Sequence, residues 1–96
     1  MALAYSTRPT ELQFLTEQLS AIESVRQAFV QTTQDSLVAL IVLDEYDAET
    51  ERRLVDIEGK LIDACPWLDI DFDVLFLGDR QLSDVVSPKG TLLFAR

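Results

Sequence analysis

Histidine is absent from this chain of 96 residues. Its absence removes the most common general base and the most common metal ligand among protein side chains. An enzyme mechanism would therefore have to rely on carboxylates, lysines, hydroxyl groups or the single cysteine, Cys65. A lone cysteine also excludes an internal disulfide and suits a reducing compartment.

Long hydrophobic runs are also lacking. The longest, Leu37 to Leu43, covers seven residues, whereas a membrane-spanning helix needs about 20. Residues 1–8 do not show the basic segment and apolar stretch of a signal peptide. We therefore expect a cytoplasmic protein that does not bind membranes.

Positive charge is scarce, because eight Lys and Arg residues stand against 17 Asp and Glu and give a net charge of −9. Phosphate backbones and anionic membranes are repelled by such a surface, so we expect no nucleic-acid partner. The same charge leaves open a partnership with a basic protein, which would weaken as salt is added.

Glycine and proline are few, with three of each, while hydrophobic residues make up 48% of the chain. This composition is typical of a packed globule, and a chain of this length supports one hydrophobic core. We predict an N-terminal arm at residues 1–8 and a single α/β domain at residues 9–96.

Apolar residues at helical spacing predict two main helices, at residues 9–23 and 48–64. The first begins at Pro9, whose missing N–H suits a first helical turn, and leaves Phe14 off its apolar stripe. The second has Asp47 as its N-cap and ends before Pro66. Its predicted buried stripe consists of Leu54, Ile57, Leu61 and Cys65, flanked by Val55 and Ile62.

Two residues at the end of the second helix are expected in the core. Cys65 lies on the buried stripe and has no basic neighbour to make its thiol reactive, so we read it as a small hydrophobic residue. Trp67 is predicted to be a core anchor, whose truncation would cost about 3–5 kcal/mol.

Four strands are predicted, at residues 25–31, 37–43, 68–77 and 91–95. The polar turn between the first two is short, which predicts an antiparallel hairpin. The second strand is apolar on both faces and should be central, and the helix after it predicts a parallel β-α-β unit with the third. The expected fold is α/β (α+β): a small mixed four-stranded sheet with two main helices on one face, and a short helix from Asp79 to Val86 before the last strand.

Two groups of carboxylates could bind a divalent cation, since hard cations prefer oxygen ligands. Asp69, Asp71 and Asp73 share one face of the third strand, and Asp44 and Asp47 follow the second strand, where open α/β sheets commonly place ligands. Simpler interpretations are a charged strand that discourages stray pairing and a loop that caps a helix. We assign no metal site and no cofactor, and keep Asp44, Asp47, Asp71 and Asp73 as weak metal candidates.

The order of the elements resembles the minimal nucleotidyltransferase domain family over about residues 12–96, with the segments Leu40–Asp44, Ile70–Leu75 and Gly90–Arg96. The resemblance implies a Gly-Ser pair after the first strand and an Asp-x-Asp motif on the second, which bind nucleotide phosphate and metal ions in that family. The matching positions hold Gln31 and Thr32, and Leu37 and Ala39, and only Asp71 or Asp73 matches the third carboxylate. The resemblance therefore implies a catalytically inactive relative.

The element order and the closing strand are also similar to the C-terminal domain of the serine-sensitivity-enhancing protein family. This second resemblance implies no known chemistry, and the sequence leaves the two families open.

The leading functional hypothesis is a non-enzymatic interaction domain that self-associates. Two helices cover one face of a sheet whose central strand is apolar on both, and an uncovered apolar face favours a two-fold homodimer. The predicted interface residues are Val38, Leu40, Val42, Leu75 and Leu77. The alternative is a residual nucleotide- or magnesium-binding enzyme that uses Asp44, Asp47, Asp71 and Asp73.

Overall fold

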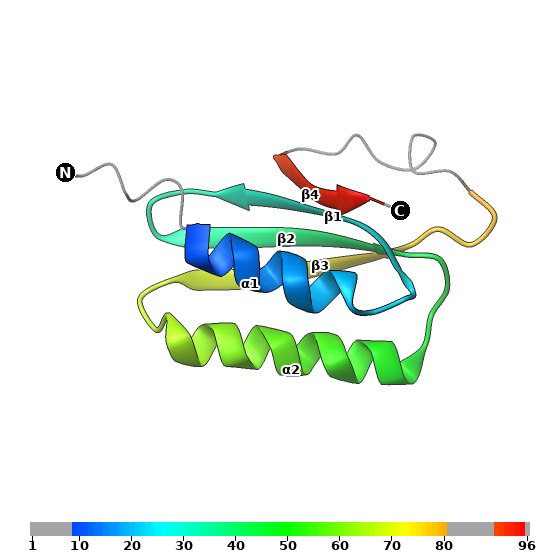
Figure 1. Cartoon of the computed structure of the whole chain (residues 1–96), viewed down its shortest axis with the longest axis horizontal. Helices are drawn as coiled ribbons and strands as arrows, with labels where there is room; N and C mark the ends of the chain where they lie inside the picture. The colour runs from blue at the N-terminus through cyan, green and yellow to red at the C-terminus, as the bar shows by residue number, and fades with distance from the viewer. Residues whose placement is uncertain (1–8, 81–89, 96) are drawn as a thin grey trace.

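The computed structural model describes residues 9–80 and 90–95, which form one sheet and two helices. Both helices lie over the same face of the sheet (Figure 1). The described residues thus confirm the predicted α+β architecture, with a mixed four-stranded sheet. The elements in chain order are α1 (Pro9–Ser20), β1 (Val25–Thr32), β2 (Ser36–Leu43), α2 (Ala48–Ala64), β3 (Asp69–Phe76) and β4 (Thr91–Ala95).

The strands lie in the order β3-β2-β1-β4, so β2 is central as predicted. β1 and β2 form the antiparallel hairpin, closed by the Thr33 N–H, which donates to the Ser36 carbonyl at 2.9 Å. The chain then crosses through α2 to β3, which pairs parallel to β2, while β4 pairs antiparallel to β1. This topology leaves β3 and β4 as the two edge strands of the described sheet.

Alternation along the strands sorts the side chains onto two faces. Residues 37, 39, 41 and 43 of β2 point toward the helices and are fully buried. They pack with the apolar stripes of both helices into one core, which includes Leu15, Leu19, Ile22, Leu54, Ile57 and Leu61. We call the opposite side of the sheet the far face; it carries Phe29, Val38, Leu40, Val42, Leu75, Leu92 and the three aspartates of β3.

The first helix differs from its prediction in length and in one packing contact. α1 ends at Ser20 rather than at residue 23, because the chain tightens into a turn in which the Ile22 N–H donates to the Leu19 carbonyl at 3.1 Å. Phe14 is partly buried against the core instead of lying off the apolar stripe. The reason is that α1 contacts α2 as well as the sheet, so its apolar face is wider than one stripe.

The second helix has the predicted bounds, 48–64, and all four residues of its predicted stripe are buried. Its N-terminus is capped by Asp47, whose carboxylate accepts hydrogen bonds from the Glu49 N–H at 3.2 Å and from the Thr50 hydroxyl at 2.9 Å. Cys65 is also buried, as predicted, and its thiol donates to Glu11 Oε2 at 3.4 Å.

The prediction that Trp67 anchors the core is wrong, because 65% of the residue is exposed. Trp67 lies in the turn between α2 and β3, and the next residue, Leu68, enters the core instead. An aromatic residue in so short a connection has no interior to point into when its neighbour already fills the space.

Two predicted segments lie outside the described residues: the N-terminal arm at residues 1–8 and nearly all of the short helix from Asp79 to Val86. The turn before that helix is described, with Gly78 at a φ of 60° that favours glycine. Within residues 9–80 and 90–95, neither helix is long and apolar enough to cross a membrane.

Candidate functional site

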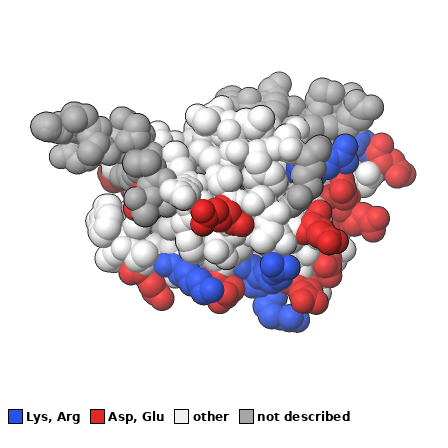
Figure 2. All heavy atoms as spheres, viewed as in Figure 1, with Lys and Arg blue, Asp and Glu red and all other residues white. Residues whose placement is uncertain are grey.

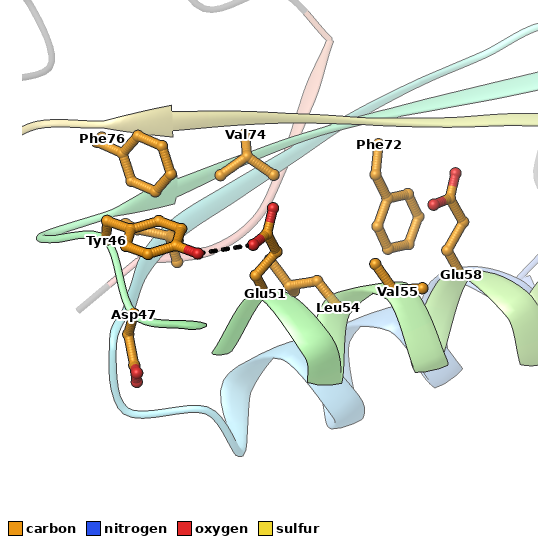
Figure 3. Close-up of a pocket in the computed structure, with 10 residues that line it drawn as sticks. Tyr46, Asp47, Glu51, Leu54, Val55, Glu58, Phe72, Val74 and Phe76 are labelled. Atoms are coloured by element: carbon orange, nitrogen blue, oxygen red, sulfur yellow. Dashed lines mark hydrogen bonds between the residues drawn. The ribbon is translucent and has the colours of Figure 1, made fainter. Parts of the chain in front are cut away.

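A groove of about 280 Å³ lies between α2 and β3, and Figure 3 shows the side chains that line it. One wall is the row of β3 side chains on the helix side of the sheet, and the other is one flank of α2. The loop between β2 and α2 closes one end. The lining residues are Leu43, Tyr46, Asp47, Glu51, Leu54, Val55, Glu58, Phe72, Val74 and Phe76.

The apolar walls of the groove remain partly open to solvent. Phe72, Val74 and Phe76 follow one another at every second position of β3, so they share one face and point toward α2 (Figure 3). On the opposite wall Leu54 turns into the core, whereas Val55 is 63% exposed. Both walls therefore expose apolar side chains, and the hydration of this apolar surface is unfavourable in free energy.

Tyr46 closes the end of the groove and is held there by two contacts. Its ring packs edge-on against Phe76, with the centroids 5.6 Å apart, an arrangement that aromatic pairs favour. Its hydroxyl donates a hydrogen bond to Glu51 Oε1 at 2.9 Å. This hydrogen bond, together with the nearby negative charge of Glu51, raises the pKa of Tyr46 above its ordinary value.

Glu58 lies at the outer rim of the groove, between α2 and the edge of β3 (Figure 3). Partial burial and the charge of Asp71 raise the pKa of Glu58, and a hydrogen bond from the Phe72 backbone offsets part of that effect. The position of Glu58 beside the edge strand therefore makes its charged form less favourable than it would be in water.

All the charged side chains that line the groove are acidic. Its lining includes the carboxylates of Asp47, Glu51 and Glu58 and no Lys or Arg. Figure 2 shows that basic side chains on this side of the molecule gather mainly along the lower rim, over α2, and that acidic side chains gather at the right-hand end. A ligand in the groove would meet an apolar surface in a negative field.

The structure does not bring the predicted metal candidates together. Asp73 lies beside Leu40 in the sheet, four residues before Asp44, which separates the two carboxylates by roughly 13 Å along the strand. Asp44 pairs with Arg26 at 2.9 Å, and Asp47 is the N-cap of α2. In residues 9–80 and 90–95, no three His, Cys, Asp or Glu residues are grouped so that they could hold a metal ion.

Asp69, Asp71 and Asp73 occupy the far face of β3, as the sequence alternation predicted. They lie beside Ser36, Val38 and Leu40 of β2 and are exposed. The three charges therefore run along the edge of the sheet on the side opposite the groove.

The predicted self-association residues divide into two groups. Val42 and Leu77 are buried within the single chain, with 0% and 5% exposed, so they contribute to its interior rather than to an accessible surface. Val38, Leu40 and Leu75 are half-buried. The far face also carries Leu92 of β4, which is 50% exposed beside Phe29 and was missed from the sequence.

No protein-family model matches this chain, and no curated protein matches it.

The groove itself was missed from the sequence. The periodicity of the sequence locates the apolar positions of β3 and α2 but does not show that they stay partly open to solvent. Val55 and Ile62 flank the buried stripe of α2, and this position is the signal in the sequence that this flank of the helix borders a partly open surface.

Proposed function

We propose that this chain is a non-catalytic protein-interaction domain whose binding surface is the groove between α2 and β3. The observation that carries the proposal is the partly exposed apolar lining on both walls, where Tyr46, Val55, Val74 and Phe76 are all exposed. A protein partner would remove this apolar area from water, which contributes roughly 25 cal/mol for each Å² buried.

The alternative, a residual nucleotide- or magnesium-binding enzyme, has less support. It needs Asp44, Asp47, Asp71 and Asp73 to converge, but the strand register separates them and two of them have structural partners. It predicts that magnesium with a nucleoside triphosphate raises the melting temperature of the chain. We expect no shift, and a shift that Asp71→Asn or Asp73→Asn abolishes would support the alternative.

The proposed origin of the domain is a nucleotidyltransferase-like scaffold without its catalytic groups. At the positions matched to the Asp-x-Asp motif, Leu37 and Ala39 point toward the helices and are fully buried. Aspartates placed there would be charges in the core, which cost several kcal/mol unless they are paired. In this chain, the positions that metal binding would use in such a scaffold hold buried core residues instead.

Site-specific photo-crosslinking tests the groove as a protein-binding surface. A photoreactive phenylalanine analogue at Val55 should yield a covalent adduct with a partner protein in the cells that make the chain. The matched control is the same analogue at Arg52, which is exposed on the same helix but does not line the groove. Equal yields at both positions, or no adduct at Val55, would contradict the proposal.

Self-association through the far face is a second candidate that the exposed Leu92 favours. It uses a different surface from the groove, so one chain could bind a copy of itself and another protein at the same time. A two-fold dimer is the most common arrangement for such a contact.

A further inference from the structure

The outer edge of β3 carries backbone groups that no described strand pairs. The Asp69 N–H donates to the Asp35 carbonyl at 2.8 Å and the Leu77 N–H to the Leu43 carbonyl at 2.9 Å. Odd-numbered residues of β3 thus direct their backbone groups toward β2. Because this direction alternates along a strand, Ile70, Phe72 and Val74 direct theirs away from the sheet.

The two ends of this edge are not equivalent. At the end of β3, Arg80 Nη2 donates to the Phe76 carbonyl at 3.1 Å and occupies that position. Near the middle, the Phe72 backbone hydrogen bonds with Glu58. The receptive part of the edge is therefore the stretch from Ile70 to Val74, where an added strand would have to displace the Glu58 side chain.

The two sides of this edge offer different chemistry. On the helix side lies the apolar groove lined by Phe72, Val74 and Val55, and on the far face lie Asp69, Asp71 and Asp73. A strand added to the edge would place its side chains alternately on these two sides. Apolar side chains would enter the groove, and Lys or Arg side chains at the positions between them would lie beside the aspartates.

From this juxtaposition we infer that the β3 edge binds an extended segment of another protein, in which apolar residues alternate with Lys or Arg, as a fifth strand. This inference rests on the proposed function and names the chemistry of the partner. Backbone hydrogen bonds supply affinity in such strand addition, and alternate side chains supply specificity.

A second copy of the chain is the less suitable occupant of this edge. Pairing β3 with another β3 would bring two rows of three aspartates onto the same face at cross-strand distance, where like charges destabilise the pair. Charged residues on an edge strand are a common way to prevent such self-pairing. The Lys or Arg side chains of a basic segment would instead be attracted to the three aspartates of β3.

Binding of synthetic peptides to the full chain tests the inference. The probe is a capped peptide of about seven residues in which Val and Arg alternate, a length that matches a short strand. Two control peptides have the same composition: one groups the Val and Arg residues in separate blocks, and the other is N-methylated at alternate residues. Calorimetry should show that the alternating peptide binds at least about tenfold more tightly than either control.

Variants of the chain separate backbone pairing from side-chain effects. Val74→Pro removes an outward N–H at an edge position, where proline is tolerated, and should abolish binding while circular dichroism and melting temperature stay close to those of the parent chain. Val74→Ala keeps the N–H but removes apolar area from the groove, so it should weaken binding less than Val74→Pro does. If Val74→Pro fails to fold, protection of the Ile70 and Val74 amides from hydrogen exchange on peptide binding gives the same information.

Charge is tested with a matched pair of double variants. Asp71→Asn with Asp73→Asn should weaken peptide binding about tenfold and reduce its dependence on salt. Asp56→Asn with Asp63→Asn changes the net charge equally on exposed positions of α2 outside the groove and should leave binding unchanged. Equal losses in both pairs would mean that only overall charge matters and would overturn the inference.

The remaining outcomes are also decisive. No binding of the alternating peptide at millimolar concentration would overturn strand addition, as would equal binding of the block peptide. A dimer that Val74→Pro dissociates would identify a second copy as the occupant and overturn the basic partner. If crosslinking at Val55 still captures a protein while the peptide fails, the interaction domain stands and only the strand-addition mode is lost.

Discussion

Glu58 of α2 and Asp71 of β3 lie close enough that the charge of Asp71 contributes to the raised pKa of Glu58. The two carboxylates approach the β3 edge from opposite sides, Glu58 from the groove and Asp71 from the far face. The β3 edge beside the groove thus lies in a negative field that favours cationic ligands.

The raised pKa of Glu58 predicts a pH dependence of stability. The folded chain binds the Glu58 proton more tightly than the unfolded chain does, so this stabilising contribution is complete below the unfolded pKa and is lost as pH rises through the folded value. Glu58→Gln, which keeps a hydrogen-bond acceptor for Phe72, should raise the free energy of unfolding at neutral pH by less than about 1 kcal/mol. Urea unfolding at neutral and acidic pH measures the difference, which should shrink in acid; a destabilised variant at neutral pH would contradict the prediction.

The Tyr46–Glu51 hydrogen bond predicts a shift in the titration of Tyr46. Glu51→Ala removes both the acceptor and the charge, so the pKa of Tyr46 should fall toward its ordinary value of 10.0. Tyrosinate absorbance in a Tyr5→Phe background reports Tyr46 alone, because the chain has two tyrosines. Glu49→Ala removes a neighbouring carboxylate that does not contact Tyr46 and is the control; an unchanged titration in Glu51→Ala would show that the hydrogen bond does not form in solution.

Removal of the α2 N-cap should destabilise the fold. Asp47→Ala loses the hydrogen bonds from the Glu49 N–H and the Thr50 hydroxyl and should cost about 0.5–2 kcal/mol. Asp47→Asn retains an oxygen acceptor, so it should destabilise the fold by only about a few tenths of a kcal/mol. Chemical denaturation compares the two, and equal losses would argue against capping as the role of this side chain.

The positions of Trp67 and Ile41 predict opposite sensitivities to truncation. Ile41 is fully buried in the central strand, and Ile41→Ala should cost about 2–5 kcal/mol through lost burial and the cavity that remains. Trp67→Ala removes a larger side chain from a mostly exposed position and should cost less than about 1 kcal/mol. Thermal unfolding followed by far-ultraviolet circular dichroism measures the stability of both variants. If Trp67→Ala lost as much stability as Ile41→Ala, the result would support the sequence-based prediction that Trp67 anchors the core.

Self-association through the far face predicts a dimer at high micromolar concentration. Leu92→Lys places a charge at a half-exposed position of that face and should shift the population to monomer without unfolding the chain. Light scattering measures the mass, and Val55→Lys in the groove is the matched control that should leave the dimer intact. A parent chain that is monomeric throughout this range would remove the second candidate function.

The fold was predictable because its periodicities are unambiguous. Leu54, Ile57 and Leu61 have the spacing of one helical face, and Asp47 and Pro66 mark the two ends, so α2 was located to the residue. The continuous apolar run of β2 indicated a strand covered on both sides and flanked by neighbours. Local capping and burial rules were sufficient for these elements.

The candidate site was less predictable because it depends on how far two elements stand apart. Val74 and Phe76 have the alternation of buried residues, and only the position of α2 leaves them partly exposed. Trp67 fails for a related reason, since hydrophobicity alone does not say which of two adjacent residues, Trp67 or Leu68, takes the one interior position available.

The row of aspartates on β3 also limits aggregation of the chain. Among the described residues, their charges are the main feature that prevents the β3 edges of two molecules from pairing. Replacing the three aspartates with asparagine would turn the strand Asp69–Phe76 into an uncharged and largely apolar template, the composition from which cross-β fibrils grow. Such a variant should therefore aggregate under conditions in which the parent chain does not.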